Sequence, residues 1–275
     1  MTNPWQEQLA HLASDSLHQE VELYPKAGLV SSVDNGSHLD MSYATFIRSI
    51  AALDGYWLEM VKLGAHGSAF ATLVAAGKQA EQAMLAATAG INTHRGAIFI
   101  LGIVVAATSY AYVQQQSPAS IPDIIRDLWG RDIYAHRLSA ASHGTQMRQR
   151  YPEAAGDIIV VAGTGFISLF DDYLPLLQNF FSENGTSAYL QVFYQILATT
   201  QDNNLLYRGG RAGLQFAQQA ARNFLQRGGI LQQDWYQQLA ELHRQFVAQN
   251  LSPGGCADLL AATIFLFKAE RLLWD

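Results

Sequence analysis

Apolar residues recur at spacings of three and four along most of this 275-residue chain, and turns rich in glycine or asparagine separate the runs. Because this spacing places apolar side chains on one face of an α-helix, it predicts helices packed around a common core. Ser42 is the expected N-cap of one helix, Gly64 its end, and Ser120 the cap of another. The expected helices span residues 5–23, 43–63, 68–87, 97–113, 133–150, 166–181, 187–200, 211–227, 232–249 and 256–273, with a further segment starting at 121.

Composition supports one large core. Hydrophobic residues make up 49% of the chain and charged residues 15%, so much apolar side chain must be buried. No internal repeat or linker divides the sequence. We therefore expect an all-α fold, a single compact multi-helix domain over residues 1–275, and the low charge fraction favours a homodimer.

The most apolar run covers residues 97–113, which at 17 residues is at the lower limit for a membrane span. The run contains Gly102, Thr108 and Ser109, so a buried central helix is the favoured interpretation. The N-terminus lacks the basic and apolar regions of a signal peptide, and we expect a cytoplasmic protein without membrane contact. A net charge of −6 argues against a nucleic-acid partner.

One segment has two interpretations. GDIIVVAGTGF at 156–166 is typical of a strand that enters a glycine turn, as in dinucleotide-binding folds. The third glycine of that motif is absent, since Ser168 occupies its place, and no alternating strands surround it. A buried β-branched helix or a short extended piece is therefore favoured.

Polar and glycine residues gather in four segments between the expected helices, at 25–41, 88–99, 201–214 and 251–261. Each segment leads from a turn into a helix start. Free N–H groups and the positive dipole end at a helix start attract phosphate, and glycine allows close approach. The nearby cations are Lys26, Arg95, Arg208 and Arg211. The carboxylates Asp40, Asp202 and Asp258 are suitable ligands for Mg²⁺.

Simpler roles compete with these. Asp, Asn and Ser at turns often only cap helices. His38 is either a metal ligand or a hydrogen-bonded histidine, and His143 is compatible with a surface position. Beside Arg95, the pKa of His94 should fall, leaving a neutral imidazole that accepts a proton. Cys256, the only cysteine, is expected to be a packing residue.

The polar segments together resemble the triphosphoribosyl-dephospho-CoA synthase family. The family's Thr-Ala-Gly-Val-Asn-Thr-His-Lys-Gly-Ala-Ile-Phe motif is nearly matched by TAGINTHRGAIF, and its Leu-Ser-Pro-Gly-Gly-Ser-Ala-Asp-Leu-Leu motif by LSPGGCADLL. EVELYPKAGLV, DNGSHLDM and DNNLLYRGGRAGL resemble its other signatures, in the same order along the chain. SHGTQMRQRY at 142–151 is closer to the branch that serves malonate decarboxylase than to the citrate lyase branch.

The resemblance implies a transferase that joins ATP to 3′-dephospho-CoA and releases adenine. The product is the triphosphoribosyl precursor of an acyl-carrier-protein prosthetic group. The resemblance also implies Mg²⁺ as cofactor, ATP as substrate, and an acyl carrier protein or the downstream holo-carrier-protein synthase as partner. The active site should be formed by inter-helix loops and helix N-termini.

The residue roles follow from the matched motifs. Asp40, Asp202 and His94 are the expected catalytic residues, and Asp40, Asp202 and Asp258 the expected metal ligands. Phosphate and substrate contacts are expected from Lys26, Asn35, His38, Asn92, Arg95, Asn204, Arg208, Gly209, Gly210, Ser252, Gly254 and Gly255.

The sequence departs from the family pattern at three places. Ser31 replaces an aspartate, Leu39 replaces a lysine, and GDIIVVA stands where the family has Gly-Ala-Arg-Gly-Glu-Ala. The lost arginine and glutamate favour a competing hypothesis, a divergent or inactive relative that binds a nucleotide or an acyl-carrier partner. An enzyme that acts on another nucleoside or phosphoribosyl substrate is a third.

Overall fold

A computed structural model describes residues 3–136, 147, 149–153 and 156–275. Within these ranges every regular element is helical and no strand occurs, so the all-α prediction is confirmed. The α-helices are α1 (Pro4–Glu22), α2 (Tyr43–Ala65), α3 (Phe70–Ala87), α4 (Arg95–Val113), α5 (Ile121–Ile125), α6 (Arg131–His136), α8 (Ile158–Gly163), α9 (Leu174–Asn184), α10 (Ala188–Thr199), α11 (Asn203–Gln226), α12 (Trp235–Ala248) and α13 (Gly254–Leu273).

Short 3-10 and π-helical turns join several of these helices. They are η1 (Pro118–Ser120), η2 (Arg126–Gly130), η3 (Leu169–Tyr173), η4 (Gly185–Ser187) and η5 (Gly229–Leu231). Ser120 does not cap α5, because its hydroxyl donates to the carbonyl of Ser117 at 2.7 Å.

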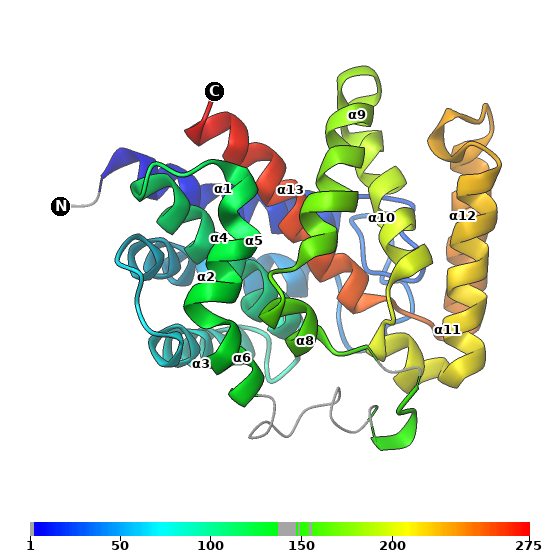
Figure 1. Cartoon of the computed structure of the whole chain (residues 1–275). Coiled ribbons are helices and arrows are strands. Elements are labelled where there is room, and N and C mark those ends of the chain that lie inside the picture. The colour runs from blue at the N-terminus through cyan, green and yellow to red at the C-terminus, as the bar shows by residue number, and fades with distance from the viewer. Residues whose placement is uncertain (1–2, 137–146, 148, 154–155) are drawn as a thin grey trace.

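Helix α4 lies at the centre of the molecule, packed against α2 and α13, while α1 packs against both of those helices (Figure 1). Among the described residues, α4 is the one helix long and apolar enough to cross a membrane by length and composition alone. However, 72% of its apolar stretch is buried inside the fold. The prediction of a buried central helix is therefore confirmed.

The prediction that Gly64 ends a helix is wrong. Helix α2 begins after Ser42 as expected but continues through Gly64 to Ala65. A Cβ atom on Gly64 would lie 2.1 Å from the carbonyl oxygen of Ala106 on α4. Glycine is needed here because the two helix backbones approach each other closely, and not because the chain turns.

The segment at 156–166 is helical and not a dinucleotide-binding turn. Asp157 caps α8 by accepting hydrogen bonds from the backbone N–H groups of Ile159 and Val160. The chain then turns at Gly165 and Phe166, which both have positive φ. The expected helix at 166–181 is accordingly shifted to η3 and α9. Part of the helix expected at 133–150, including His143, lies outside the described residues.

Three helices that lead out of candidate site segments begin earlier than expected, and the first of them, α4, begins at Arg95 instead of residue 97. Helix α11 starts at Asn203 and continues across a kink at Gly210, whose φ of 62° and ψ of −161° are not helical. Helix α13 starts at Gly254, directly after Pro253. Much of the polar sequence predicted to be loop therefore forms the first turns of helices.

Candidate active site

The N-termini of α4, α11 and α13 meet in the interior of the fold. A Cβ atom on Gly96 of α4 would lie 1.9 Å from Oδ2 of Asp258 on α13. One on Gly255 of α13 would lie 3.1 Å from Oδ2 of Asp202, which precedes α11. Three of the four polar segments thus come together, although Asp202 is 107 positions after Arg95 and Asp258 is a further 56 positions after Asp202.

Asp202 caps two helices with one carboxylate. Its Oδ1 accepts from the N–H groups of Asn204 and Leu205 at 2.7 and 3.2 Å, and its Oδ2 accepts from the N–H of Cys256 at 3.0 Å. Asp202 is buried. Burial raises its pKa, and these backbone hydrogen bonds oppose the rise because they stabilise the charged form.

Asp258 lies over the first turn of α4 and is partly exposed. Burial of its carboxyl group raises its pKa well above the usual range, and the nearby carboxylates of Glu20 and Asp202 raise it further. A hydrogen bond from the N–H of Ala97 has the opposite effect. Glu20 on α1, Asp202 before α11 and Asp258 on α13 are therefore close enough to interact electrostatically, and we call these three residues the carboxylate cluster.

Lys26 does not fit the predicted role of a phosphate-binding cation. Its side chain is 1% exposed, and its ammonium group binds both the carboxylate and the carbonyl oxygen of Glu20. Burial lowers the pKa of Lys26, while the Glu20 carboxylate raises it. The sequence-based assignment did not include Glu20, although Glu20 stands in the EVELYPKAGLV motif.

His94 is buried at the N-cap of α4. Its Nδ1 lies 2.6 Å from the hydroxyl of Ser49, which accepts a hydrogen bond from Thr93. Burial lowers the pKa of His94 to about 3, and Lys26 and His18 contribute electrostatically. The imidazole is neutral as predicted, but burial is the main cause of its lowered pKa, and the cation that contributes is Lys26 and not Arg95, which pairs with Glu81.

The predicted binding of phosphate to these helix starts does not fit the observed capping. Asn92 Oδ1 accepts from the N–H of Arg95 at 3.1 Å, Asp258 accepts from Ala97, and Asp202 accepts from α11 and α13. Side chains of the protein thus already accept hydrogen bonds from several of the N–H groups that phosphate oxygens would bind.

A second polar group joins three segments at the protein surface. The guanidinium of Arg208 donates to the carbonyl of Ser37 at 3.0 Å, to Oδ1 of Asn250 at 2.8 Å and to Nδ1 of His38 at 3.1 Å. His38 Nε2 lies 2.8 Å from the hydroxyl of Ser252. Burial and Arg208 lower the pKa of His38 to about 4.

This arrangement assigns the proton of His38. Because Arg208 can only donate, Nδ1 accepts, and Nε2 carries the hydrogen that is donated to Ser252. His38 therefore cannot accept the Ser252 proton as in a serine nucleophile. The hydrogen-bonded role considered for His38 is confirmed, and the Ser252 hydroxyl hydrogen is left to donate elsewhere.

The remaining candidate residues are spread around these two groups. The Asp40 side chain is 64% exposed, with Oδ1 3.8 Å from Nδ1 of His38. Asn35 and Asn204 are exposed. Gly254 packs on the side-chain amide of Asn204, where a Cβ would lie 2.9 Å from Nδ2, and Gly209 packs on Leu251.

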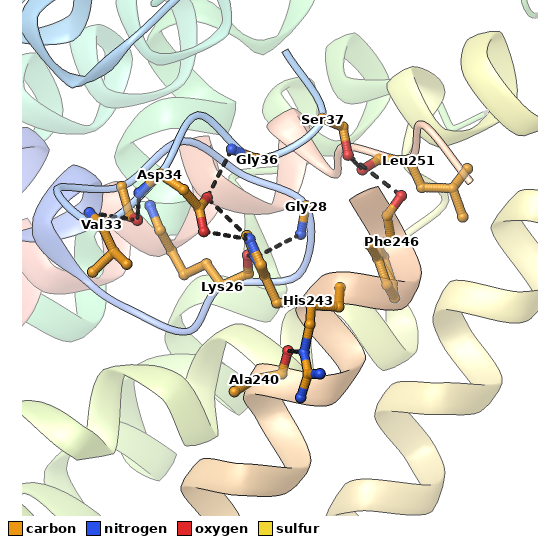
Figure 2. Close-up of polar contacts among 12 residues, drawn as sticks. Lys26, Gly28, Val33, Asp34, Gly36, Ser37, Ala240, His243, Phe246 and Leu251 are labelled. Carbon is orange, nitrogen blue, oxygen red and sulfur yellow. Dashed lines mark hydrogen bonds and ion pairs between the residues drawn. The ribbon is translucent and has the colours of Figure 1, made fainter. Parts of the chain in front are cut away.

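The loop between α1 and α2 is held on α12 by a histidine that the sequence did not indicate. His243 Nδ1 donates to the carbonyl of Lys26 at 2.6 Å, and its Nε2 lies 3.0 Å from Oδ1 of Asp34 (Figure 2). At the other end of this loop, the Ser37 hydroxyl donates to the carbonyl of Leu251 at 2.6 Å. These contacts fix both Lys26 and His38.

Two further predictions concern metal and thiol chemistry. Among the described residues, no three His, Cys, Asp or Glu side chains are grouped so as to hold a metal ion. Asp40, Asp202 and Asp258 are therefore not brought together as one ligand set. Cys256 is fully buried, and burial with the Asp202 carboxylate raises the pKa of its thiol well above the usual range. Its expected packing role is confirmed.

The divergent segment at 156–163 lies beside this site. The carbonyl of Gly156 accepts from the side-chain amide of Asn203 at 2.9 Å, and a Cβ on Gly156 would lie 2.1 Å from the carbonyl oxygen of Gln201. The segment thus packs directly against the residues that flank Asp202. Here Asp157 is used to cap α8.

A surface groove lies elsewhere, between α11 and α12, with a volume of about 620 Å³. Its walls include Gln215, Phe216 and Gln219 on α11 and Gln245 on α12. None of the candidate residues lines it, so the chemistry of the carboxylate cluster locates the site better than the size of a groove.

The chain resembles proteins of one family over nearly its full length. Residues 6–275 match the family model described as ATP:dephospho-CoA triphosphoribosyl transferase. A protein from Acinetobacter calcoaceticus, described as a probable 2-(5''-triphosphoribosyl)-3'-dephosphocoenzyme-A synthase, is 39% identical over 94% of this chain and 90% of its own length. A synthase of that description from Klebsiella pneumoniae is 34% identical over the same shares. No solved structure matches the chain.

Proposed function

The chain belongs to the ATP:dephospho-CoA triphosphoribosyl transferase family, and we propose that its reaction takes place where α4, α11 and α13 begin. The enzyme joins ATP to 3′-dephospho-CoA and releases adenine. The product is the prosthetic-group precursor of citrate lyase or malonate decarboxylase. We assign the malonate decarboxylase branch, on the resemblance of residues 142–151.

The reaction exchanges one bond at C1 of the ATP ribose. The 2′-oxygen of dephospho-CoA forms a bond to C1, and the bond from C1 to N9 of adenine breaks, with its electron pair leaving on adenine. The hydroxyl proton passes to a base, and adenine takes up one proton. As in other glycosyl transfers, positive charge develops on the ribose in the transition state.

The charge of the buried cluster supports this placement. Glu20, Asp202 and Asp258 contribute three carboxyl groups, and Lys26 contributes one ammonium group. His94 is neutral. An excess of carboxylate in a desolvated site stabilises a cationic ribosyl group and repels a triphosphate. This is the observation that carries the proposal.

Asp258 is the general base in this scheme. Both Asp202 oxygens accept backbone N–H groups, and Glu20 is held by Lys26. Asp258 is partly exposed and accepts from one backbone N–H, so its carboxylate can also contact a substrate hydroxyl. The lost family glutamate at 156–162 is then no obstacle, because Glu20 and Asp258 supply carboxylates from other helices.

The triphosphate lies outside the carboxylate cluster, in the direction of the exposed cations. Arg95 is 47% exposed, and Arg208 joins the loop that carries Asp40. The exposed Asp40 carboxylate would hold Mg²⁺, which would supply positive charge to neutralise the triphosphate. This mode fits an ion that usually combines one or two carboxylates with substrate phosphates.

The surroundings of the enzyme follow from its reaction. ATP and dephospho-CoA are cytoplasmic substrates, so we place the protein in the cytoplasm. The holo-carrier-protein synthase that uses the product, or the acyl carrier protein, is the proposed protein partner. A homodimer is proposed from the low share of charged residues.

Adenine release tests the proposal. Wild-type protein with ATP, Mg²⁺ and 3′-dephospho-CoA should form adenine and the adduct mass only when both substrates are present. Asp258→Asn should lower kcat by about 10²–10⁴, the usual contribution of a general base. Asp171→Asn is the matched control, because Asp171 is exposed on η3. No adenine from the wild type would refute the transferase function, and a fully active Asp258→Asn would refute the assigned base.

A further inference from the structure

The hydrogen bonds around His94 determine which ring nitrogen carries its proton. The hydroxyl of Thr93 donates to Ser49 Oγ at 2.6 Å, so the Ser49 hydrogen is free to point toward His94. Ser49 Oγ lies 2.6 Å from His94 Nδ1, which then accepts. In a neutral imidazole the hydrogen therefore resides on Nε2.

This Nε2–H group is buried and has no hydrogen-bond partner in the structure. The side chain is 3% exposed, and the ring of Phe46 packs against it edge to face with 5.0 Å between centroids. Leaving a buried donor unpaired is unfavourable, because the group has lost its hydrogen bond to water and gained none in return. Such groups in native proteins call for a specific explanation, of which a catalytic role is one. A substrate atom that accepts the hydrogen bond provides it.

The surroundings of His94 favour a ring nitrogen of the adenine base over a phosphate oxygen as that hydrogen-bond acceptor. Lys26, which acts electrostatically on His94, is already bound to Glu20, and the neighbouring cluster has more carboxyl than ammonium groups. A triphosphate would be repelled there, whereas an uncharged planar purine would not. The positive dipole end of α4 and a neutral donor do favour negative charge that develops on a purine during the reaction.

We propose that His94 donates a hydrogen bond from Nε2 to N3 or N7 of the leaving adenine, an inference that rests on the proposed function. These two ring nitrogens are each one atom removed from N9 and share the electron pair left when the C1–N9 bond breaks. His94 transfers no proton in this role, and the proton that adenine gains comes from elsewhere. A neutral histidine donor at a helix start is an established way to stabilise developing negative charge.

Two conservative variants distinguish the acceptor role of His94 Nδ1 from the donor role of His94 Nε2. His94→Asn keeps an acceptor for Ser49 at the position of Nδ1 and removes the donor at the position of Nε2. His94→Gln places an amide N–H near the position of Nε2. We expect kcat for adenine release to fall by about 10²–10³ in His94→Asn, as for loss of one donor to a developing anion, and to recover in part in His94→Gln. His66→Gln, on an exposed histidine, should have no effect.

ATP analogues that lack one nitrogen of the adenine ring identify which nitrogen accepts the hydrogen bond from His94. The loss caused by His94→Asn should shrink markedly with 7-deaza-ATP or with 3-deaza-ATP, whichever lacks the nitrogen that His94 contacts. An equal loss with ATP and both analogues would overturn the proposal. So would an increase in KM at unchanged kcat, which would indicate a phosphate contact, or full activity of His94→Asn, which would indicate a buried water as the partner.

A binding measurement keeps this inference separate from the transferase function. Adenine added to ¹⁵N-histidine-labelled wild-type protein should shift the His94 Nε2 resonance and leave that of His66 in place. If adenine shifts the resonance but no turnover occurs, the transferase function fails and the adenine contact stands. If turnover occurs without a shift, the adenine contact is wrong.

Discussion

The backbone N–H of Cys256 donates a 3.0 Å hydrogen bond to Oδ2 of Asp202, so a single buried carboxylate caps both α11 and α13. The N-termini of these helices hold the Asp202–Arg208 and Ser252–Asp258 segments. A residue that the sequence predicted to be catalytic thus positions the backbone of the candidate site.

Replacing Asp202 should therefore destabilise the protein. Loss of an N-cap costs about 0.5–2 kcal/mol, and loss of the hydrogen bond from Cys256 adds about 1 kcal/mol. We expect Asp202→Ala to lower the free energy of unfolding by about 1.5–3 kcal/mol in urea denaturation. Asp234→Ala is the control, because Asp234 precedes α12 without a side-chain cap. A similar, small loss in both variants would contradict the double-cap role.

Gly96 should be required for the position of Asp258. A Cβ at this position would lie 1.9 Å from Asp258 Oδ2, so the carboxylate must move in Gly96→Ala. Displacement of a reacting group by 1 Å can cost about 10²-fold in rate. We expect kcat/KM for adenine release to fall by about that factor. Gly55→Ala on α2, which meets no atom within 4 Å, should retain activity, and equal activity of both variants would refute the requirement.

Arg208 should act mainly as a clamp between loops. Lysine cannot reproduce the planar guanidinium that reaches Ser37, His38 and Asn250 together. Arg208→Lys is expected to raise KM for the nucleotide several-fold, because the loop with His38 and Asp40 loses its attachment. Arg211→Lys, whose contact to Glu153 is 3.9 Å long, serves as control. If KM is unchanged in Arg208→Lys, the clamp does not contribute to binding.

Stability should decrease on acidification through His94. The pKa of this residue is about 3 in the folded protein and 6.5 in the unfolded chain. Between these values the unfolded state binds one more proton, so the free energy of unfolding decreases as the pH falls from 6.5 toward 3. One such group contributes a slope of about 1.4 kcal/mol per pH unit. His94→Gln should reduce the measured slope between pH 6 and 4 by about this amount, and an unchanged slope would contradict a buried neutral His94.

The helix starts at the candidate site were predictable because helix capping depends on a few neighbouring residues. The Asn-Thr-His and Ser-Pro-Gly-Gly motifs mark helix starts, and helices do begin at Arg95 and Gly254. The role of Lys26 was not predictable in the same way. Lys26 follows Glu20 by six residues and precedes the turn at Gly28. This sequence context is equally compatible with an exposed lysine that binds phosphate and with a buried ion pair.

The sequence by itself determined the helical fold and the order of the polar segments, because the three-to-four spacing of apolar residues and the capping residues act within a few positions. Only the tertiary structure decided that Glu20, Asp202 and Asp258 form one cluster, that Gly64 admits a neighbouring helix, and that His94 has an unpaired donor. These depend on how distant helices pack and on how far water is excluded, and neither can be read from neighbouring residues.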